Sequence, residues 1–263
     1  MPVFTIITVC LNIASTIRRT CESIVNQTFQ DFQWIVVDGA STDGTLDILK
    51  EYSSRIDILI SEPDKGIYNA MNKGIKHATG EYINFMNGGD EFYNNNVLEN
   101  VFLNKTFKGD IIYGDEYKIK NGESYLFKNW ETITEDILFN RYGITHQSSF
   151  TKTIILKKYG FNEEYTIAAD FDFFVRVFKK RHSFSKIPII INKFYEDGIS
   201  STNEYLNNLE YQEIKRKNFK TKVFLLNHPK IIEFIVFITN SVKYPRYFFG
   251  WFKRIIIKQK AES

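Results

Sequence analysis

The sequence predicts an α/β protein whose core is a mostly parallel β-sheet. Short apolar runs rich in β-branched residues alternate with segments of helical period through residues 4–86. Strands and helices that alternate in this way form βαβ units, in which consecutive strands lie parallel. A polar cluster also follows each of the first four expected strands. Because ligands bind beyond the carboxyl ends of such strands, we expect one binding site at that edge of the sheet.

The first four strands are expected at residues 4–10, 34–37, 56–60 and 82–86. The helix after the first strand has apolar residues at helical spacing over residues 17–25, and Ser15 is its expected N-cap. A second helix covers about residues 46–52. The third, residues 67–78, has the clearest amphipathic pattern in the chain, and Gly80 fits its end.

The second half of the chain is less regular. Three strands and two helices are expected there, at residues 110–120, 123–129 and 186–194 and at residues 153–158 and 171–180, respectively. From about Ile214 the composition changes to apolar residues followed by Lys and Arg mixed with Tyr, Phe and Trp. An interfacial helix on an anionic membrane has this composition, and so has a terminal helix packed on a core. No run is long enough to span a membrane. We therefore expect an α/β domain at residues 1–213 and a basic, aromatic helical extension at 214–263.

The composition is that of an ordinary folded protein, with 43% hydrophobic and 25% charged residues in 263. A net charge of +3 argues against a nucleic-acid binder, which would concentrate a larger basic excess on one face. The two cysteines, Cys10 and Cys21, lack metal-binding spacing and fit a reducing compartment. The N-terminus has no basic region typical of a signal peptide, so we expect a cytoplasmic protein.

Candidate ligand-binding residues follow the second and third strands. Asp38 ends the second strand, where its carboxylate is suited either to a nucleobase N–H or ribose hydroxyl, or to closing a turn. Asp43 is interpreted as structural, because it stands just before a helix. Asp64 and Lys65 precede the third helix, whose N-terminus and the ammonium group both favour phosphate. Acids at helix starts are also common for structural reasons.

Asn87-Gly88-Gly89-Asp90 follows the fourth strand. The two glycines allow the backbone to approach a ligand closely. The Asp90 carboxylate is a hard oxygen ligand of the kind that Mg²⁺ or Mn²⁺ prefers. A tight turn that happens to contain an aspartate is the alternative.

Two later segments complete the set, His146-Gln147 and the Asp170-Phe171-Asp172 run. Asp170 is suited to act as a general base, or to serve as the N-cap of the helix that follows, with Asp172 then an acid of its first turn. His146 either packs in the core or takes part in catalysis.

In this order, these segments resemble glycosyltransferase family 2, whose members have the GT-A fold. The resemblance runs from about residue 4 to 202. Its landmarks are Thr8-Val9-Cys10-Leu11-Asn12, residues 36–45, residues 61–74, His146-Gln147, Ala169-Asp170-Phe171-Asp172 and Gly198-Ile199-Ser200. Each motif is modest alone, but six in sequence are specific.

The resemblance implies a GT-A, Rossmann-like mixed sheet flanked by helices, and a nucleotide-sugar donor, UDP-linked in preference to GDP-linked. Asp38 would contact the base, Asp90 would bind a divalent metal ion, and Asp170 would be the catalytic base. The donor would be bound by Thr8, Asn12, Asp38, Asp64, Lys65, Asn72, Asn87 and Gly88. The acceptor side would be lined by His146, Gln147 and Asp172.

The sequence departs from the family pattern at two places. Asn87 stands where the metal motif has its first acid, and Gly89 replaces another frequent acid. Asp38 is single where many relatives carry two acids. Relatives that build bacterial surface polysaccharides look similar at both places, so the departures leave the metal ligand open without implying inactivity.

We therefore expect an inverting glycosyltransferase that moves a sugar from a UDP-sugar to a saccharide or lipid-linked saccharide in surface-polysaccharide synthesis. It would use Mn²⁺ or Mg²⁺ and would contact the anionic inner face of the cell membrane through its tail. A catalytically silent nucleotide-sugar-binding or scaffold protein is the main alternative, supported by Asn87. A sugar nucleotidyltransferase would need a glycine-rich loop after the first strand, and residues 10–15 contain no glycine.

Overall fold

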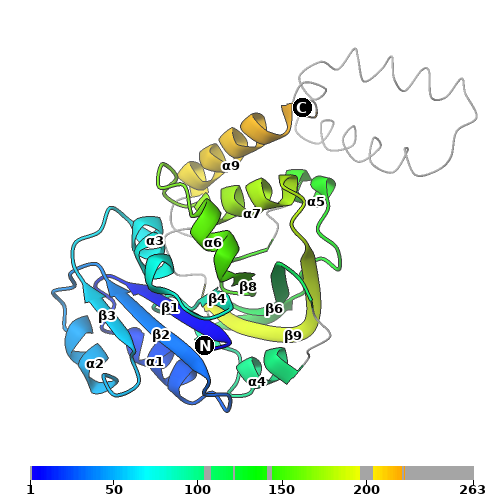
Figure 1. Cartoon of the computed structure of the whole chain (residues 1–263). Helices are drawn as coiled ribbons and strands as arrows, with labels where there is room; N and C mark the ends of the chain where they lie inside the picture. The colour runs from blue at the N-terminus through cyan, green and yellow to red at the C-terminus, as the bar shows by residue number, and fades with distance from the viewer. Residues whose placement is uncertain are drawn as a thin grey trace, which may run out of the picture. The chain divides into compact units, whose positions relative to one another are not determined.

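The computed structural model describes residues 2–103, 108–120, 122–140, 144–195, 204–220 and 222. The chain divides into two units, Met1–Ile214 and Lys215–Ser263, and the sheet and the site lie in the first. The Gly198-Ile199-Ser200 motif and the basic, aromatic tail from residue 223 onward lie outside the described residues. Figure 1 shows the arrangement of the elements.

The N-terminal half forms the expected series of alternating strands and helices. Its strands are β1 (Phe4–Cys10), β2 (Phe32–Asp38), β3 (Ile58–Ser61) and β4 (Tyr82–Phe85). The helices between them are α1 (Ile17–Val25), α2 (Thr45–Glu51) and α3 (Ile67–His77). β1 pairs in parallel with β2 and β4, and β2 with β3, as predicted. The N-cap of α1 is Thr16 and not Ser15, and no side chain caps this helix.

The second half adds antiparallel strands. Its elements are β5 (Glu91–Phe92), α4 (Val97–Leu103), β6 (Ile111–Lys120), β7 (Glu123–Phe127), α5 (Glu135–Asn140), β8 (Ser149–Lys152), α6 (Thr153–Tyr159), α7 (Ala169–Lys179), β9 (Phe184–Tyr195) and α9 (Glu204–Asn218). The sequence analysis missed β5, β8, α4, α5 and α9. β8 shows why: it is only four residues long, and it is a strand because β4 and β6 pair with it on both sides.

In the described residues the sheet runs β3-β2-β1-β4-β8-β6-β9-β5, with β7 paired to β6. β4 is parallel to β1 but antiparallel to β8, so the direction changes in the middle of the sheet. The predicted mixed α/β sheet flanked by helices is therefore confirmed.

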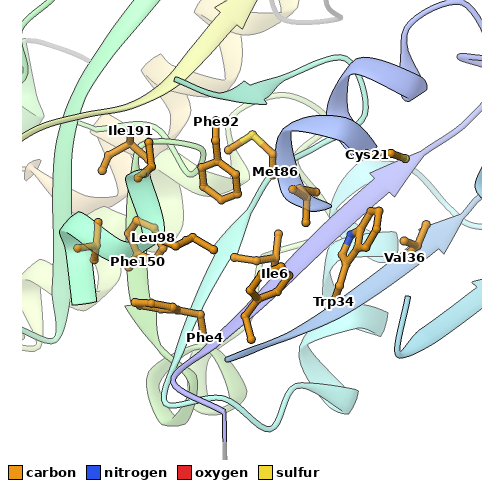
Figure 2. Close-up of a cluster of buried hydrophobic side chains, with 14 of the residues drawn as sticks. Phe4, Ile6, Cys21, Trp34, Val36, Met86, Phe92, Leu98, Phe150 and Ile191 are labelled. Carbon is orange, nitrogen blue, oxygen red and sulfur yellow. The ribbon is translucent and has the colours of Figure 1, made fainter. Parts of the chain in front are cut away.

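Helices cover both faces of the sheet, with α1, α2 and α4 on one face and α3, α6 and α7 on the other (Figure 1). β1 is buried along its whole length. Ile6 belongs to the core cluster with Trp34 and Phe150 that Figure 2 shows. Its neighbour Ile7 faces α3, where a Cβ on Gly74 would lie 2.7 Å from Ile7 Cγ2. The absence of a side chain at Gly74 therefore lets α3 pack closely on β1.

The carboxyl ends of the first strands lie side by side. Cys10 pairs with Asp38, and Asp38 pairs with Ser61. The β1–β4 pairing brings Phe85 opposite Ile7, so the loop after β4 begins at the same edge. The loops after β1, β2, β3 and β4 therefore gather at the edge where the sequence predicted a site.

Candidate active site

A cavity of about 460 Å³ opens at this edge of the sheet. Loops after β1, β3 and β4 line it, together with residues 145–147, the segment before α7, the end of β9 and α9. Seven of the predicted site residues line it, namely Asp64, Asn87, Gly88, Asp90, His146, Gln147 and Asp170. These come from four separate segments of the chain, and only the fold brings them together.

Asp170 lies in the first turn of α7, with a side chain 14% exposed. Its Oδ2 accepts a hydrogen bond from His146 Nδ1 at 2.8 Å. Its Oδ1 accepts from the Phe171 backbone N–H at 2.7 Å and lies 3.3 Å from the Tyr68 hydroxyl, which donates its proton to Ile167 O at 2.5 Å. The N-cap of α7 is Ala168, so the alternative that Asp170 caps this helix is wrong. The carboxylate is fixed in orientation and faces the cavity.

His146 joins the two ends of the site. Asn87 Nδ2 lies 2.8 Å from His146 Nε2, and an amide nitrogen can only donate. His146 Nε2 is therefore the acceptor, and the ring carries its proton on Nδ1, which donates it to Asp170. The imidazole packs edge-to-face against the Phe85 ring, with 6.3 Å between the ring centroids, and this contact holds it in place. His146 thus orients Asp170 and is itself oriented by Asn87.

Asp90 is 7% exposed and lines the same cavity. Its Oδ2 accepts a hydrogen bond from Gln147 Nε2 at 2.9 Å. Burial raises the pKa of this carboxyl from 3.8 to about 6, against the lowering effect of Gln147 and His146. A buried carboxylate loses its hydration, so a bound cation stabilises its charged form more than it would stabilise an exposed one.

Asn87 Oδ1 is buried without a hydrogen-bond partner. Together with the Asp90 carboxylate it offers two hard oxygens at one end of the cavity. No group of three or more His, Cys, Asp or Glu that could hold a metal occurs among the described residues. Mg²⁺ and ions like it are often held by one or two protein oxygens plus substrate phosphates and water. The residues present therefore fit a divalent ion that binds together with a diphosphate.

The loop that carries Asn87 and Asp90 depends on its glycines. A Cβ on Gly88 would lie 2.0 Å from Ile13 Cδ1, so the backbone there packs against the loop after β1. Gly89 has a φ of 101°, a conformation that favours glycine. Arg19 Nε donates to Gly89 O at 2.7 Å, and the guanidinium lies over the Tyr195 ring. Gly88 and Gly89 are therefore required for the packing of this loop, whether or not a ligand also approaches its backbone.

Asp38, which the family resemblance implies to contact the base, is not among the residues that line this cavity. It is fully buried, and its Oδ2 accepts from Ser41 N at 3.0 Å and Ser61 Oγ at 2.8 Å. The turn interpretation of Asp38 fits these contacts. Asp64 instead faces the cavity, and its Oδ2 would lie 2.6 Å from a Cβ on Gly39. The space that a second acid after β2 would occupy is therefore taken by the carboxylate of Asp64.

Four further residues predicted to bind the donor are not among the residues that line this cavity. Thr8 is buried in the core, where its Oγ1 accepts from Trp34 Nε1 at 3.1 Å. Asn12 Oδ1 accepts from Thr42 N at 2.9 Å and ties two loops together. The remaining two residues are Lys65, which is exposed, and Asn72, whose amide binds the backbone of Phe161.

Asp172 does not line the acceptor side of the cavity. Its Oδ2 accepts from Arg176 Nε at 2.6 Å, and Arg176 in turn donates to Tyr159 O and Gly160 O. Successive helical residues are about 100° apart, so Asp170 and Asp172 point in different directions from α7. Asp172 stabilises the packing of α7 against α6.

The sequence analysis missed several lining residues. Tyr68 is buried on α3, and burial together with the Asp170 charge raises the pKa of its hydroxyl well above 10. Tyr195 ends β9, and Asn207 and Tyr211 lie on α9. Tyr68 sits in the third motif and was within reach of sequence reasoning. The residues on α9 follow no motif, so no signal pointed to them.

The comparisons with known proteins agree with this geometry. Residues 5–183 match the model of glycosyl transferase family 2. A PGL/p-HBAD biosynthesis glycosyltransferase of Mycobacterium bovis (strain BCG / Pasteur 1173P2) is 29% identical over 262 residues, which covers 93% of this chain and 98% of that protein.

Among solved structures, S. aureus TarS 1-349 in complex with UDP-GlcNAc superposes with a TM-score of 0.67 at 20% identity, over 81% of this chain and 64% of that one. This chain spans 36% of the longer TarS chain. The mannosyltransferase PcManGT from Pyrobaculum calidifontis, in complex with GDP-Man and Mn²⁺, gives a TM-score of 0.56 at 18% identity, over 73% of this chain and 56% of that one. Within the described part of this chain, no helix is long and apolar enough to cross a membrane.

The mixed sheet is that of GT-A transferases, and its carboxyl edge bears a cavity with an oriented carboxylate at one end and a buried acid at the other. With the family match over more than half of its length, the chain belongs to glycosyltransferase family 2 and is a glycosyltransferase of the GT-A fold.

Proposed function

We propose that this glycosyltransferase moves a sugar from a UDP-sugar to a hydroxyl of a saccharide or lipid-linked saccharide, with inversion at the anomeric carbon. Asp170 is the general base. Asp90 and Asn87 hold a divalent ion at the donor diphosphate. The observation that carries the proposal is the continuous set of contacts from Asn87 through His146 to Asp170 within one cavity.

The reaction is a single displacement. As the acceptor oxygen attacks the anomeric carbon, its proton passes to the Asp170 carboxylate. The bond between the anomeric carbon and the phosphate oxygen breaks on the opposite face, and UDP leaves with the electron pair. Because the acceptor attacks once, from the face opposite the leaving group, the configuration of the anomeric carbon is inverted. His146 and the Phe171 backbone N–H donate to the Asp170 carboxylate and hold it in a fixed orientation.

The donor is bound at the β1 to β4 end of the cavity. Asp64 is placed to accept a hydrogen bond from the base or the ribose, in the position that Gly39 leaves open. A divalent ion, when bound, would neutralise the charge that develops on the diphosphate. Asn87 Oδ1 and the Asp90 carboxylate would be its protein ligands. UDP is favoured by the family resemblance and by the ligands of TarS, which are UDP and UDP-GlcNAc.

The test is a panel of UDP-, GDP- and dTDP-hexoses incubated with the full chain, with and without Mn²⁺. Nucleotide release and the anomeric configuration of the product are measured by NMR. We expect Mn²⁺-dependent release from a UDP-sugar. The Asp170→Asn variant should lose turnover by about 10²- to 10⁴-fold with unchanged UDP affinity.

Asp172→Asn is the matched control, because Asp172 lies on the same helix but away from the cavity. It should lower stability and keep turnover in the folded protein. Near-normal transfer by Asp170→Asn would refute the base assignment. UDP binding without release from any donor would favour a silent binding protein.

A further inference from the structure

Helix α9 contributes two side chains to the cavity, Asn207 and Tyr211. They are four residues apart and therefore lie on the same face of the helix. The family match ends at residue 183, so this wall of the cavity lies beyond the matched segment. Nothing in the motifs of the sequence assigns a role to it.

Glu210 anchors α9 to the segment that leads into the catalytic helix. Its buried carboxylate accepts hydrogen bonds from the backbone N–H groups of Thr166 at 2.7 Å, Ile167 at 2.9 Å and Ala168 at 2.8 Å. Ala168 is the N-cap of α7, so the carboxylate also complements the positive end of that helix. Hydrogen bonds to a charged group are stronger than neutral ones, so α9 is held rigidly beside Asp170.

The Tyr211 ring packs against Phe171, the residue after Asp170, with 4.6 Å between ring centroids. Asn207 Oδ1 is buried and has no hydrogen-bond partner. A buried acceptor without a partner costs free energy, and a ligand that donates to it recovers that cost. Asn207 therefore places an acceptor without a partner in the same wall of the cavity as the Tyr211 ring.

The position of this surface selects the ligand. The diphosphate end of the cavity is marked by Asn87 and Asp90, on the loop after β4. Helix α9 instead contacts the segment around Asp170, through Glu210 and through the ring pair of Tyr211 and Phe171. In the proposed reaction, Asp170 takes the proton of the acceptor hydroxyl. The group that contacts the α9 side chains is then part of the acceptor. A sugar ring can make both contacts. One of its hydroxyl groups can donate a hydrogen bond to Asn207, and its apolar C–H face can pack on the Tyr211 ring.

We infer that α9 is the acceptor-recognition element of this enzyme, with Asn207 as a specificity-determining residue that accepts a hydrogen bond from a hydroxyl of the acceptor sugar. Tyr211 supplies the surface for its ring, and Glu210 is a positioning residue. The inference rests on the proposed function for the direction of the reaction.

The experiment measures binding of two probes to the full-length protein. Saturation-transfer NMR titrations give the affinity of p-nitrophenyl hexopyranosides (gluco, galacto and manno) for protein loaded with UDP and Mn²⁺, and calorimetry gives the affinity for UDP. Asn207→Leu should weaken the best glycoside about tenfold, the effect of one lost hydrogen bond, and change UDP affinity by less than about twofold. Asn207→Gln, which keeps a carbonyl oxygen, should stay within about threefold of wild type.

Asn208→Leu is the matched control, because Asn208 is the exposed neighbour on the same helix. Equal glycoside affinity in the Asn207→Leu and Asn208→Leu variants would overturn the inference, and so would a failure of every glycoside to bind wild type. An equal loss of UDP affinity would assign Asn207 to the donor instead. Because no turnover is needed, these results are separate from the donor-panel test of the proposed function. Melting temperatures of all variants identify any that fail to fold.

Discussion

At the scale of single residues, the direction of a side chain decides its chemistry. Asp170 and Asp172 stand two positions apart on α7, yet one faces the cavity and the other forms an ion pair with Arg176. Asp38 and Asp64 differ in the same way, since only Asp64 faces the cavity. All four are aspartates that the family resemblance marked as site residues, so residue type alone could not separate the members of each pair.

His146 is expected to set the orientation of Asp170. The His146→Phe variant keeps the ring packing against Phe85 but removes the donor to the carboxylate. Loss of one hydrogen bond to a charged group should lower kcat by roughly 10- to 100-fold, measured as UDP release at saturating donor. The control is His182→Phe, which removes a similar contact to Asp110, at 3.0 Å. A similar loss of kcat in both variants would contradict a positioning role for His146.

Asp90 is expected to make the stability of the metal-free protein depend on pH. Its folded-state pKa of about 6 lies above the ordinary 3.8, so the folded form keeps its proton while the unfolded chain ionises. The associated stability is present below pH 4 and is lost as the pH rises towards 6. The loss is about 3 kcal/mol.

Urea unfolding in EDTA at pH 4 and pH 7 measures this loss. Relative to wild type, Asp90→Asn should gain about 3 kcal/mol between the two values, because the amide cannot ionise. If the free energy of unfolding changed equally with pH in the two proteins, Asp90 would have an ordinary pKa.

At the scale of elements, the site depends on how closely loops pack beneath it. The loop after β4 lies against the loop after β1, and Gly88 is the point of closest approach. The segment before α7 is held in the same manner from the other side, by Glu210 of α9. The proposed catalytic residues therefore sit on a loop and on the first turn of a helix, and both are fixed by neighbours from distant parts of the chain.

Gly88→Ala is expected to destabilise the protein by about 1–3 kcal/mol, because the new methyl group would overlap Ile13 Cδ1. It should also lower turnover, since Asn87 and Asp90 flank it on the same loop. Ile13→Val removes Cδ1 and should restore part of the lost stability in the double variant. Chemical denaturation of the four proteins of this double-mutant cycle gives the coupling. Simple additivity of the two changes would argue against this contact.

At the scale of the whole molecule, a change of strand direction in the middle of the sheet creates the cavity. β4 is parallel to β1, whereas β8 and β6 bring residues 145–147 back to the same edge from the antiparallel half. The loops that would bind the donor and the carboxylate that would act as the base in the proposed reaction therefore meet across the sheet centre. The C-terminal tail, from residue 223, adds a proposed contact with membrane that the sequence alone suggests.

The full chain is expected to bind vesicles that contain anionic phosphatidylglycerol, and to release them as salt is raised. Each basic residue near such a surface contributes about 1 kcal/mol, so reversing Lys253 and Arg254 to Glu should weaken partitioning by at least about 30-fold. Sedimentation with neutral phosphatidylcholine vesicles is the control. Unchanged sedimentation of the reversed variant would remove the membrane proposal.

The architecture of the N-terminal half could be predicted from local sequence patterns. Residues 4–10 and 34–37 were identifiable as strands because both faces are apolar, and the helical period of residues 67–78 marked α3. Asn87, Asp90, His146 and Asp170 were also identifiable, because each lies in a family motif. Local pattern and the order of motifs suffice for these, since strand and helix period depend on neighbouring residues alone.

Only the tertiary structure decided which candidates meet. Thr8 alternates onto the core face of β1, Asp38 is enclosed by its own turn, and Asp172 is about 200° around α7 from Asp170. The proposed acceptor-binding residues on α9 were likewise visible only in the structure. Asn207 and Tyr211 line the cavity because Glu210, on the same helix, binds a backbone segment about 40 residues earlier in the sequence. Such placements depend on long-range packing, which no periodicity in the chain encodes.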